Sequence, residues 1–115
     1  MAETVVYRMH SASYPASDPS GAMRAAGRWH SQGTRVIYAA DHISLALLET
    51  LIHAGGRRLP PRSLTRIVIP GSLAIETSAW LNEPDSRAFG DAWVRSARTA
   101  ILRVPSIAVN GLEHF

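Results

Sequence analysis

The distribution of apolar residues along the chain predicts several short strands. In residues 4–10, Val5, Tyr7 and Met9 fall on one face of an extended segment and Arg8 falls on the other. Residues 64–69 form a second apolar run, which Pro70-Gly71 ends. Further short strands are predicted at residues 28–30, 35–40, 73–76, 100–104 and 107–109.

A 3.6-residue apolar period predicts two helices. The first runs over residues 43–54, with Asp41 as its N-cap and Gly55-Gly56 as its stop. Its apolar residues cover more than half of the circumference, so we expect this helix to be largely buried. Glu49 falls at the edge of the apolar arc, beside His53, and its carboxylate should lie at a core boundary. The second helix is predicted over residues 85–98, with a stripe of Phe89, Ala92, Trp93 and Ala97.

The connections carry turn signals. Residues 11–27 are rich in Ser, Pro, Gly and Ala and predict a long loop, of the kind that often serves as a lid or binding loop. Residues 57–62 predict a basic loop, and Gly33 predicts a turn. Asn110-Gly111 is a strong hairpin signal, but only four residues follow it. We therefore expect a C-terminus shortened before the returning strand.

The composition excludes several classes of protein and of chemistry. The chain has 115 residues, the size of one domain, with 46% hydrophobic and 18% charged residues, as in ordinary globular proteins. No apolar run approaches the ~20 residues of a membrane span, and the N-terminus lacks signal-peptide order. We expect a cytoplasmic protein that does not contact membranes. The absence of cysteine excludes disulfides, thiol catalysis and Cys-ligated zinc.

All twelve basic residues are arginines, which excludes Schiff-base chemistry and a P-loop lysine. The net charge of +3 suits an anionic small molecule or an acidic partner and argues only weakly for nucleic acid. Fingerprints of Rossmann folds, Walker loops, α/β-hydrolases and zinc proteases are absent. Glu49 and His53 lack a third ligand, so we expect no metal site.

Three residues carry candidate chemistry. Arg28 offers a planar fork for phosphate, Tyr38 an aromatic hydroxyl, and Glu49 a carboxylate, and these groups together could hold a dinucleotide and break its glycosidic bond. Each also has an ordinary structural interpretation: an arginine stacked on Trp29 or paired with an acid, a core tyrosine with a satisfied hydroxyl, and a surface carboxylate on a helix. Arg8 is a second phosphate candidate, although a strand arginine is usually only solvent-exposed.

The segments GRWHSQGTRVIYAADHISLALLETLIH (residues 27–53), Gly90-Asp91-Ala92-Trp93 and Leu102-Arg103-Val104-Pro105-Ser106 resemble, in order and spacing, the RES domain family. These are small toxins of bacterial toxin–antitoxin pairs, usually encoded beside an Xre-type antitoxin. Two departures stand out: the family usually has asparagine where His30 stands, and it continues past residue 115 with an Asn-Pro-containing segment.

The resemblance implies a compact single α/β (α+β) domain over residues 1–115, with a small mixed sheet and flanking helices similar to ADP-ribosylating toxins. It implies NAD+ as substrate, degraded by phosphorolysis or hydrolysis or used to modify a protein. The family's catalytic arginine, tyrosine and glutamate match Arg28, Tyr38 and Glu49. Its early arginine and later serine match Arg8 and Ser106, which implies that both contact NAD+; from sequence alone, Ser106 is an ordinary turn residue after a proline.

The resemblance leaves three functions to compare. The first is a toxin that cleaves the nicotinamide–ribose bond of NAD+ and is neutralised by a protein antitoxin. The second is a mono-ADP-ribosyltransferase toxin with a protein target. The third is an interaction module with a degenerate, non-catalytic site. In the first two, residues 11–27 and 57–62 should flank the NAD+ cleft, where an antitoxin carboxylate could pair with Arg28 or Arg8.

Overall fold

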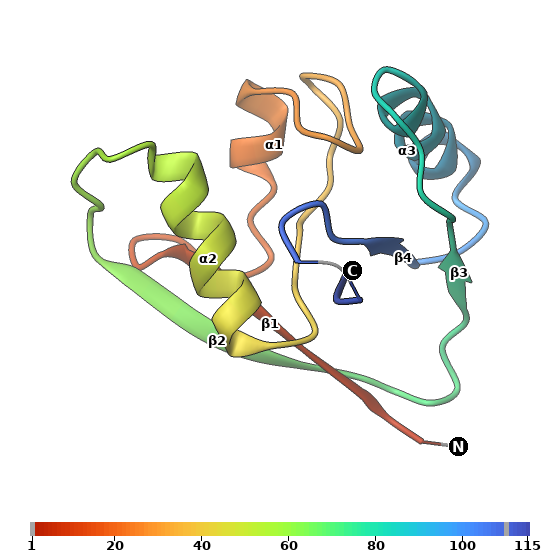
Figure 1. The fold of residues 1–115 in the computed structure, drawn as a ribbon. Coiled ribbons are helices and arrows are strands. Elements are labelled where there is room, and N and C mark those ends of the chain that lie inside the picture. Colours follow the sequence, from red (N-terminus) through yellow and green to blue (C-terminus); the bar gives the residue numbers. More distant parts are fainter. Residues whose placement is uncertain (1, 110) are drawn as a thin grey trace.

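The computed structural model describes residues 2–109 and 111–115 and forms one α+β domain with three helices and small mixed sheets (Figure 1). This confirms the expected fold class. Among the described residues, no helix is long and apolar enough to cross a membrane. The elements, in chain order, are β1 (Thr4–Ser11), α1 (Ser20–Arg24), α2 (Ile43–Ala54), β2 (Arg62–Ile69), β3 (Ile75–Thr77), α3 (Asp85–Ser96), β4 (Ile101–Pro105) and β5 (Glu113–His114).

The strands form two small sheets that one residue connects. β1 and β2 pair antiparallel over eight residues, and β4 lies between β3, which is parallel to it, and β5, which is antiparallel. Ala40 forms isolated bridges with Tyr7 of β1 and His114 of β5. Its backbone therefore joins the two sheets and holds the segment before α2 against both.

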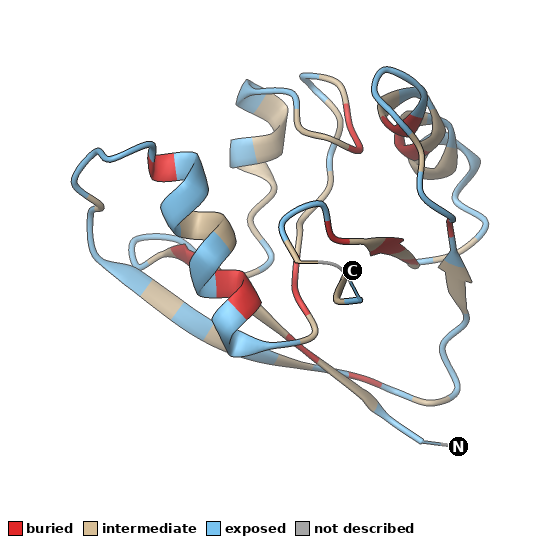
Figure 2. Cartoon of the chain, viewed as in Figure 1, coloured by how far each residue is buried: buried red, intermediate tan, exposed pale blue. Residues whose placement is uncertain are grey.

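Helix α2 begins and ends where the sequence predicts, and Gly55 closes it in the left-handed conformation with φ 58°. The predicted N-cap was wrong. His42 occupies the cap without a side-chain hydrogen bond, and Asp41 instead accepts a bond from the backbone of Glu113. The expectation of a largely buried helix was also wrong. Of the described helices and strands, β1 is the main one that α2 packs on, and within the helix only Leu45, Ala46 and Ala54 are buried (Figure 2).

Helix α3 packs on the turn formed by residues 27–30. Ser86, which is fully buried, donates a hydrogen bond from its hydroxyl to the carbonyl oxygen of Arg28 at 2.7 Å. Gly90 lies so close to this turn that a Cβ atom there would stand 1.7 Å from the carbonyl oxygen of Trp29. Of the predicted stripe on α3, Phe89 and Trp93 pack beside buried Trp29, whereas Ala92 and Ala97 are exposed.

Several local predictions were wrong. Residues 11–27 are not all loop, since they contain α1. Residues 28–30 form a tight turn closed by a bridge between Gly27 and His30, not a strand. Residues 35–40 are irregular apart from the bridge at Ala40, and residues 107–109 are bends. The strand predicted at residues 73–76 lies at Ile75–Thr77.

The C-terminal residues return to the sheet, which the sequence did not lead us to expect. The predicted turn residue Asn110 lies outside the described residues. Glu113 and His114 pair with Pro105 and Val104, and Phe115 exchanges two backbone hydrogen bonds with Ala39. The C-terminal backbone therefore borders the same segment that carries Tyr38.

Candidate functional site

Four of the five predicted site residues line a cleft of about 940 Å³. Arg8 comes from β1, Arg28 from the 27–30 turn, Tyr38 from the segment before α2, and Glu49 from α2. Residues 21–22, 25–27 and 57–60 also line it, so parts of the two segments expected to flank an NAD+ site border this cleft. The predicted site thus converges from four parts of the chain on one cleft.

Glu49 sits at the core boundary, as predicted, with its side chain 21% exposed. Its Oε1 atom is buried and makes no hydrogen bond with the described residues. Two histidines lie beside the carboxylate: Nε2 of His114 is 3.3 Å from Oε1, and Nε2 of His53 is 4.0 Å from Oε2. The Glu49 carboxylate therefore lies between two imidazole rings at the wall of the cleft.

Arg28 is held by several contacts. Its guanidinium stacks over the ring of Trp80 at 4.2 Å and donates a hydrogen bond to the carbonyl oxygen of Leu81. Its Nη1 atom lies 3.7 Å from Oε1 of Glu83. Arg28 therefore makes the structural contacts that the sequence left open, since it stacks on an aromatic ring and lies beside an acid. The main stacking partner is Trp80 and not Trp29. The buried Nε atom still has no hydrogen-bond partner among the described residues.

Glu83 places a carboxylate between two arginines of the cleft. Its Oε2 atom accepts a hydrogen bond at 3.0 Å from Arg87, whose Nε also donates to the carbonyl oxygen of Gly27. Arg28 and Arg87 both line the cleft and share this partly exposed carboxylate. Two guanidinium groups around one acidic group form an arrangement that suits an anion.

Arg8 is partly buried, and among the described residues its guanidinium donates hydrogen bonds only to backbone oxygens. It donates hydrogen bonds at 3.2 Å to the carbonyl oxygens of Tyr38 and Asp18, and its buried Nε has no partner among the described residues. Burial lowers the pKa of the Arg8 guanidinium, and the nearby Asp18 carboxylate partly offsets that change. Because its charge is only weakly balanced by protein acids, Arg8 is well suited to an anionic ligand.

Tyr38 is anchored through its hydroxyl. The hydroxyl oxygen lies 2.6 Å from Nδ1 of His30 and accepts a hydrogen bond from the backbone N–H of Trp29 at 3.3 Å. Burial raises the pKa of Tyr38 to about 12, so the phenol stays protonated at neutral pH. This is the satisfied core tyrosine that the sequence left as an alternative. The same side chain nevertheless borders the cleft.

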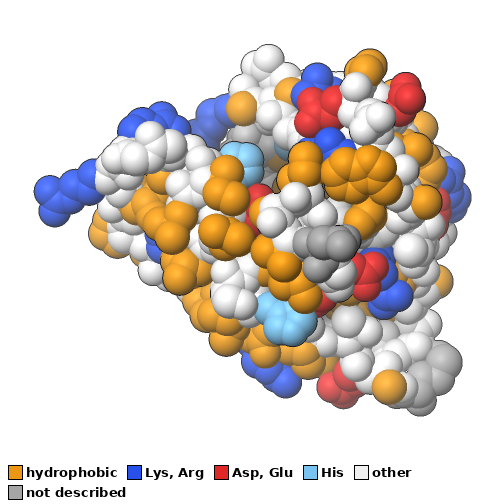
Figure 3. Space-filling model, in the orientation of Figure 1, with side chains coloured by type: hydrophobic (Ala, Val, Ile, Leu, Met, Phe, Trp, Pro, Cys, Tyr) orange, Lys and Arg blue, Asp and Glu red, His pale blue; other side chains and the backbone are white. Residues whose placement is uncertain are grey.

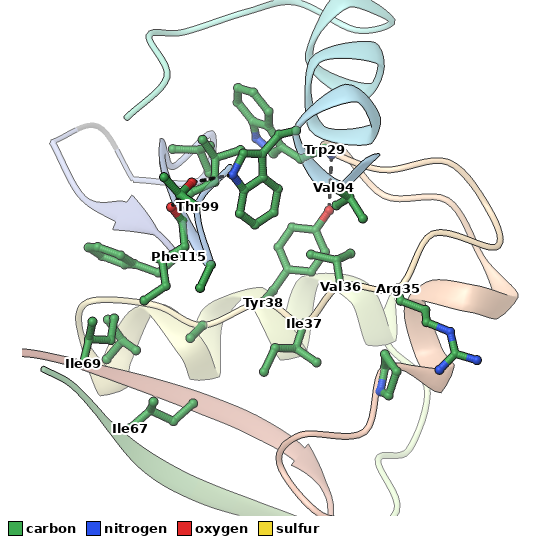
Figure 4. A pocket seen from close by; sticks show the side chains of 18 of the residues that line it. Trp29, Arg35, Val36, Ile37, Tyr38, Ile67, Ile69, Val94, Thr99 and Phe115 are labelled. Atoms are coloured by element: carbon green, nitrogen blue, oxygen red, sulfur yellow. Dashed lines mark hydrogen bonds between the residues drawn. The ribbon is translucent and has the colours of Figure 1, made fainter. Parts of the chain in front are cut away.

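Tyr38 also lines a second, mainly apolar cavity of about 500 Å³. Figure 4 shows the Tyr38 ring pointing into this cavity toward Trp29 and Val94. Tyr38 thus borders both cavities, and only part of its side chain can contact a ligand in the cleft.

Ser106 does not line the cleft, although Pro105 and Ile107 on either side of it do. It is buried, and its hydroxyl oxygen accepts hydrogen bonds from the backbone N–H groups of Ala108 and Val109. In this structure Ser106 therefore closes a local turn, as a serine after proline commonly does. Its predicted contact with NAD+ stays a prediction.

Sequence reasoning missed four contributors to the cleft: His30 as the partner of Tyr38, His114 beside Glu49, and the pair Glu83 and Arg87. His30 could have been singled out in the sequence, since it replaces the asparagine usual in the family. Nothing in the sequence marks His114, because only the return of β5 beside Ala40 brings it to α2. Within the described residues, no group of three or more His, Asp or Glu side chains is placed to hold a metal ion.

Residues 5–114 match the RES domain. The chain is 37% identical over 111 residues to the Prs ADP-ribosylating toxin of Sphingobium sp. (strain YBL2), covering 84% of this chain and 69% of that protein. It is 34% identical over 118 residues to Toxin Res of Photorhabdus laumondii, covering 91% of this chain and 75% of that protein. It is 32% identical over 117 residues to Toxin Res of Yersinia enterocolitica, covering 91% and 77%. The matched residues include the whole lining of the cleft.

Proposed function

This chain belongs to the RES domain family, and on that premise we propose that it is a toxin enzyme that cleaves the nicotinamide–ribose bond of NAD+. The observation that carries the proposal is the convergence of Arg8, Arg28, Tyr38 and Glu49 on one cleft of about 940 Å³. That volume lies at the upper end of the range for small-molecule sites, as a dinucleotide requires.

The substrate has two parts that need opposite partners. The pyrophosphate is anionic, and Arg8, Arg28 and Arg87 supply guanidinium groups along the cleft. The bound phosphate oxygens would take the place that the Glu83 carboxylate now occupies beside Arg28 and Arg87. Binding thus exchanges one anion for another and does not require new buried charge.

Cleavage of the bond creates positive charge on the ribose, as in glycoside hydrolysis. Glu49 would accept a hydrogen bond from a ribose hydroxyl and stabilise that charge through its carboxylate, which lines the cleft. Nicotinamide leaves as a neutral molecule with the electron pair of the broken bond. Tyr38, fixed by His30, would contact the substrate from the wall of the cleft.

The acceptor of the ADP-ribose group distinguishes two reactions with the same first step. Water or phosphate gives NAD+ degradation. A protein side chain gives ADP-ribosylation, and the name of the Sphingobium relative favours this second candidate. Four arginines at the mouth or wall of the cleft, Arg57, Arg58, Arg62 and Arg87, suit either phosphate or an acidic protein surface.

An enzyme that drains NAD+ must be held inactive in its own cell, so we include a protein antitoxin, of the Xre type, in the proposal. Its carboxylates would enter the cleft and pair with Arg28 or Arg8 in place of the pyrophosphate. Competition binding tests this point: NAD+ or ADP-ribose should exclude the antitoxin. Simultaneous binding without mutual effect would contradict inhibition through the cleft.

The experiment that tests the main proposal incubates the purified chain with NAD+, with and without phosphate, and measures both free nicotinamide and labelled protein. Nicotinamide release without protein labelling identifies degradation, and dependence on phosphate identifies phosphorolysis. Labelled protein identifies the transferase. No nicotinamide release under any condition would reject both reactions and leave the non-catalytic interaction module.

A further inference from the structure

Strand β2 is an edge strand with a free backbone. Residues 62–69 pair with β1 on one side, and the described residues form no backbone ladder on the other. Figure 1 shows β2 along the outer border of the domain. An edge of eight residues is long, and it presents a row of N–H and C=O groups to which another strand can pair.

The side chains on one face of β2 are exposed in a regular order. Arg62, Leu64, Arg66 and Val68 are all exposed, with Leu64 44% and Val68 40% exposed. The register pairs Leu64 with Met9, Arg66 with Tyr7, and Val68 with Val5, so this face is the one that α2 covers on β1. On this face of the sheet, α2 covers β1 and leaves the side chains of β2 exposed.

Helix α2 adds apolar surface beside this face. Ile43, Leu47, Leu48, Leu51 and Ile52 are between 37% and 55% exposed, an unusual density of large apolar side chains on a single helix. Figure 3 shows hydrophobic side chains gathered over α2. Together the β2 edge, its Arg-Leu-Arg-Val face and the outer side of α2 form what we call the β2–α2 surface.

We propose that the β2–α2 surface binds a partner protein by accepting one of its strands at the β2 edge. The strand fits best if one of its faces alternates acidic and apolar side chains, because acidic residues would then lie beside Arg62 and Arg66 and apolar residues beside Leu64 and Val68. An apolar element following that strand would cover the exposed leucines of α2. Arg62 also lines the cleft, so the partner reaches the mouth of the site.

The charge of the β2 edge favours an acidic partner strand over a second copy of the chain. Two β2 strands paired across a two-fold axis would bring Arg62 and Arg66 of both copies into one seam. No carboxylate lies on this face of β2 to balance them, among the residues that the structure describes. Like charges on neighbouring strands are destabilising, so an acidic partner fits the surface better than a second copy does.

A designed peptide tests the surface without any enzymatic readout. The probe is the capped nonapeptide Thr-Glu-Thr-Val-Thr-Glu-Thr-Val-Thr, and the control replaces both glutamates with lysine. Binding is followed by NMR shifts and backbone amide exchange at up to about 1 mM peptide, where even roughly −4 kcal/mol of binding gives half occupancy. We expect the glutamate peptide to protect every second amide of residues 62–69. We also expect it to bind about tenfold tighter than the lysine peptide.

Charge reversal provides the matched variants. The Arg62→Glu, Arg66→Glu double variant should bind the lysine peptide better than the glutamate peptide. The Arg24→Glu, Arg95→Glu variant changes two exposed arginines elsewhere and should keep the wild-type preference.

Equal binding of both peptides, protection outside β2, or no binding at the highest concentration would overturn the proposal. A dimer that forms through β2 in sedimentation would overturn it in favour of a second copy. These readouts are independent of NAD+, so failure of the proposed function leaves them unaffected.

Discussion

The hydroxyl of Tyr38 donates a hydrogen bond to Nδ1 of His30 across 2.6 Å. The direction follows from the other ring nitrogen: Nε2 of His30 lies 2.8 Å and 3.1 Å from the carbonyl oxygens of Ala25 and Ala22, so it carries the hydrogen and Nδ1 is the acceptor. This buried contact ties the residues around α1, the 27–30 turn and the segment before α2 to one another. It fixes the wall of the cleft that carries Arg28.

Replacing Tyr38 with phenylalanine removes the donor to His30 and leaves Nδ1 buried without a partner. We expect the free energy of unfolding to fall by about 1–3 kcal/mol, the usual effect of an unsatisfied buried group. Urea unfolding measures the change. Tyr14→Phe is the control, since Tyr14 is 55% exposed and the substitution should change stability little. Equal stability of Tyr38→Phe and wild type would mean that this bond does not hold the site together.

Arg28→Lys keeps the charge but loses the planar group that stacks on Trp80 and can bind phosphate through two hydrogen bonds. If the proposed function holds, the KM for NAD+ should rise about tenfold or more, since hydrogen bonds to charged groups contribute about 1.5–3 kcal/mol. Steady-state nicotinamide release measures it. Arg95→Lys, at an exposed position on α3 outside the cleft, should leave the KM unchanged. An unaltered KM for Arg28→Lys would assign Arg28 a purely structural role.

Glu83→Gln should have the opposite effect on the KM. The Glu83 carboxylate now lies beside Arg28 and Arg87, where it competes with the pyrophosphate for the same groups. Its removal should lower the KM by up to roughly fivefold, in line with about 0.2–1 kcal/mol for an exposed ion pair. Glu76→Gln, which breaks the ion pair with Arg98 outside the cleft, serves as the control. A raised KM for Glu83→Gln would mean that Glu83 supports binding.

Asp91 makes the fold sensitive to acid. Partial burial raises the pKa of its carboxyl, but hydrogen bonds from the Ser31 hydroxyl and amide and from the Thr34 hydroxyl outweigh this, and the net pKa lies below its usual value. A pKa lower in the folded than in the unfolded chain stabilises the fold above the unfolded value of about 3.9. That contribution is lost as pH falls through the folded pKa. Asp91→Asn should destabilise the fold at neutral pH by about 1–3 kcal/mol and lose part of this acid dependence.

Unfolding measured at several pH values, with Asp85→Asn as the control at an exposed position on α3, checks both parts of this expectation. An identical pH dependence in Asp91→Asn and wild type would show that the Asp91 hydrogen bonds do not determine the acid stability of the fold.

Local pattern was sufficient to predict the long elements of the fold. β1, β2 and the bounds of α2 follow from periodicity and from the breaks at Pro70-Gly71 and Gly55-Gly56. Helix α1 has five residues and no buried side chain, so it leaves no apolar period to detect. The exposure of α2 arises because the helix packs on β1 and not on β2, which no property of residues 43–54 determines. Residues 35–40 have strand-like composition, but pairing at Ala40 alone leaves them irregular.

The lining of the cleft was predictable for residues whose own side chains suggest chemistry, and not for residues that distant segments bring together. Arg28, Tyr38 and Glu49 were identified before the fold was known, and all three line the cleft. Glu83 and His114 could not be identified, because their proximity to Arg28 and Glu49 arises from contacts between residues more than fifty positions apart. Contacts of that range depend on the complete packing of α3 and β5.

Nicotinamide release by wild-type protein and by Glu49→Gln tests the central claim most directly. The substitution keeps the shape of the side chain and removes its charge, so the fold should survive while turnover falls roughly 100–1000-fold, as for loss of one electrostatic group in other enzymes. Glu3→Gln, at an exposed position near the N-terminus, should retain full turnover. Turnover of Glu49→Gln close to that of wild type would contradict the account, because the Glu49 carboxylate would then not be the group that stabilises the cleaving ribose.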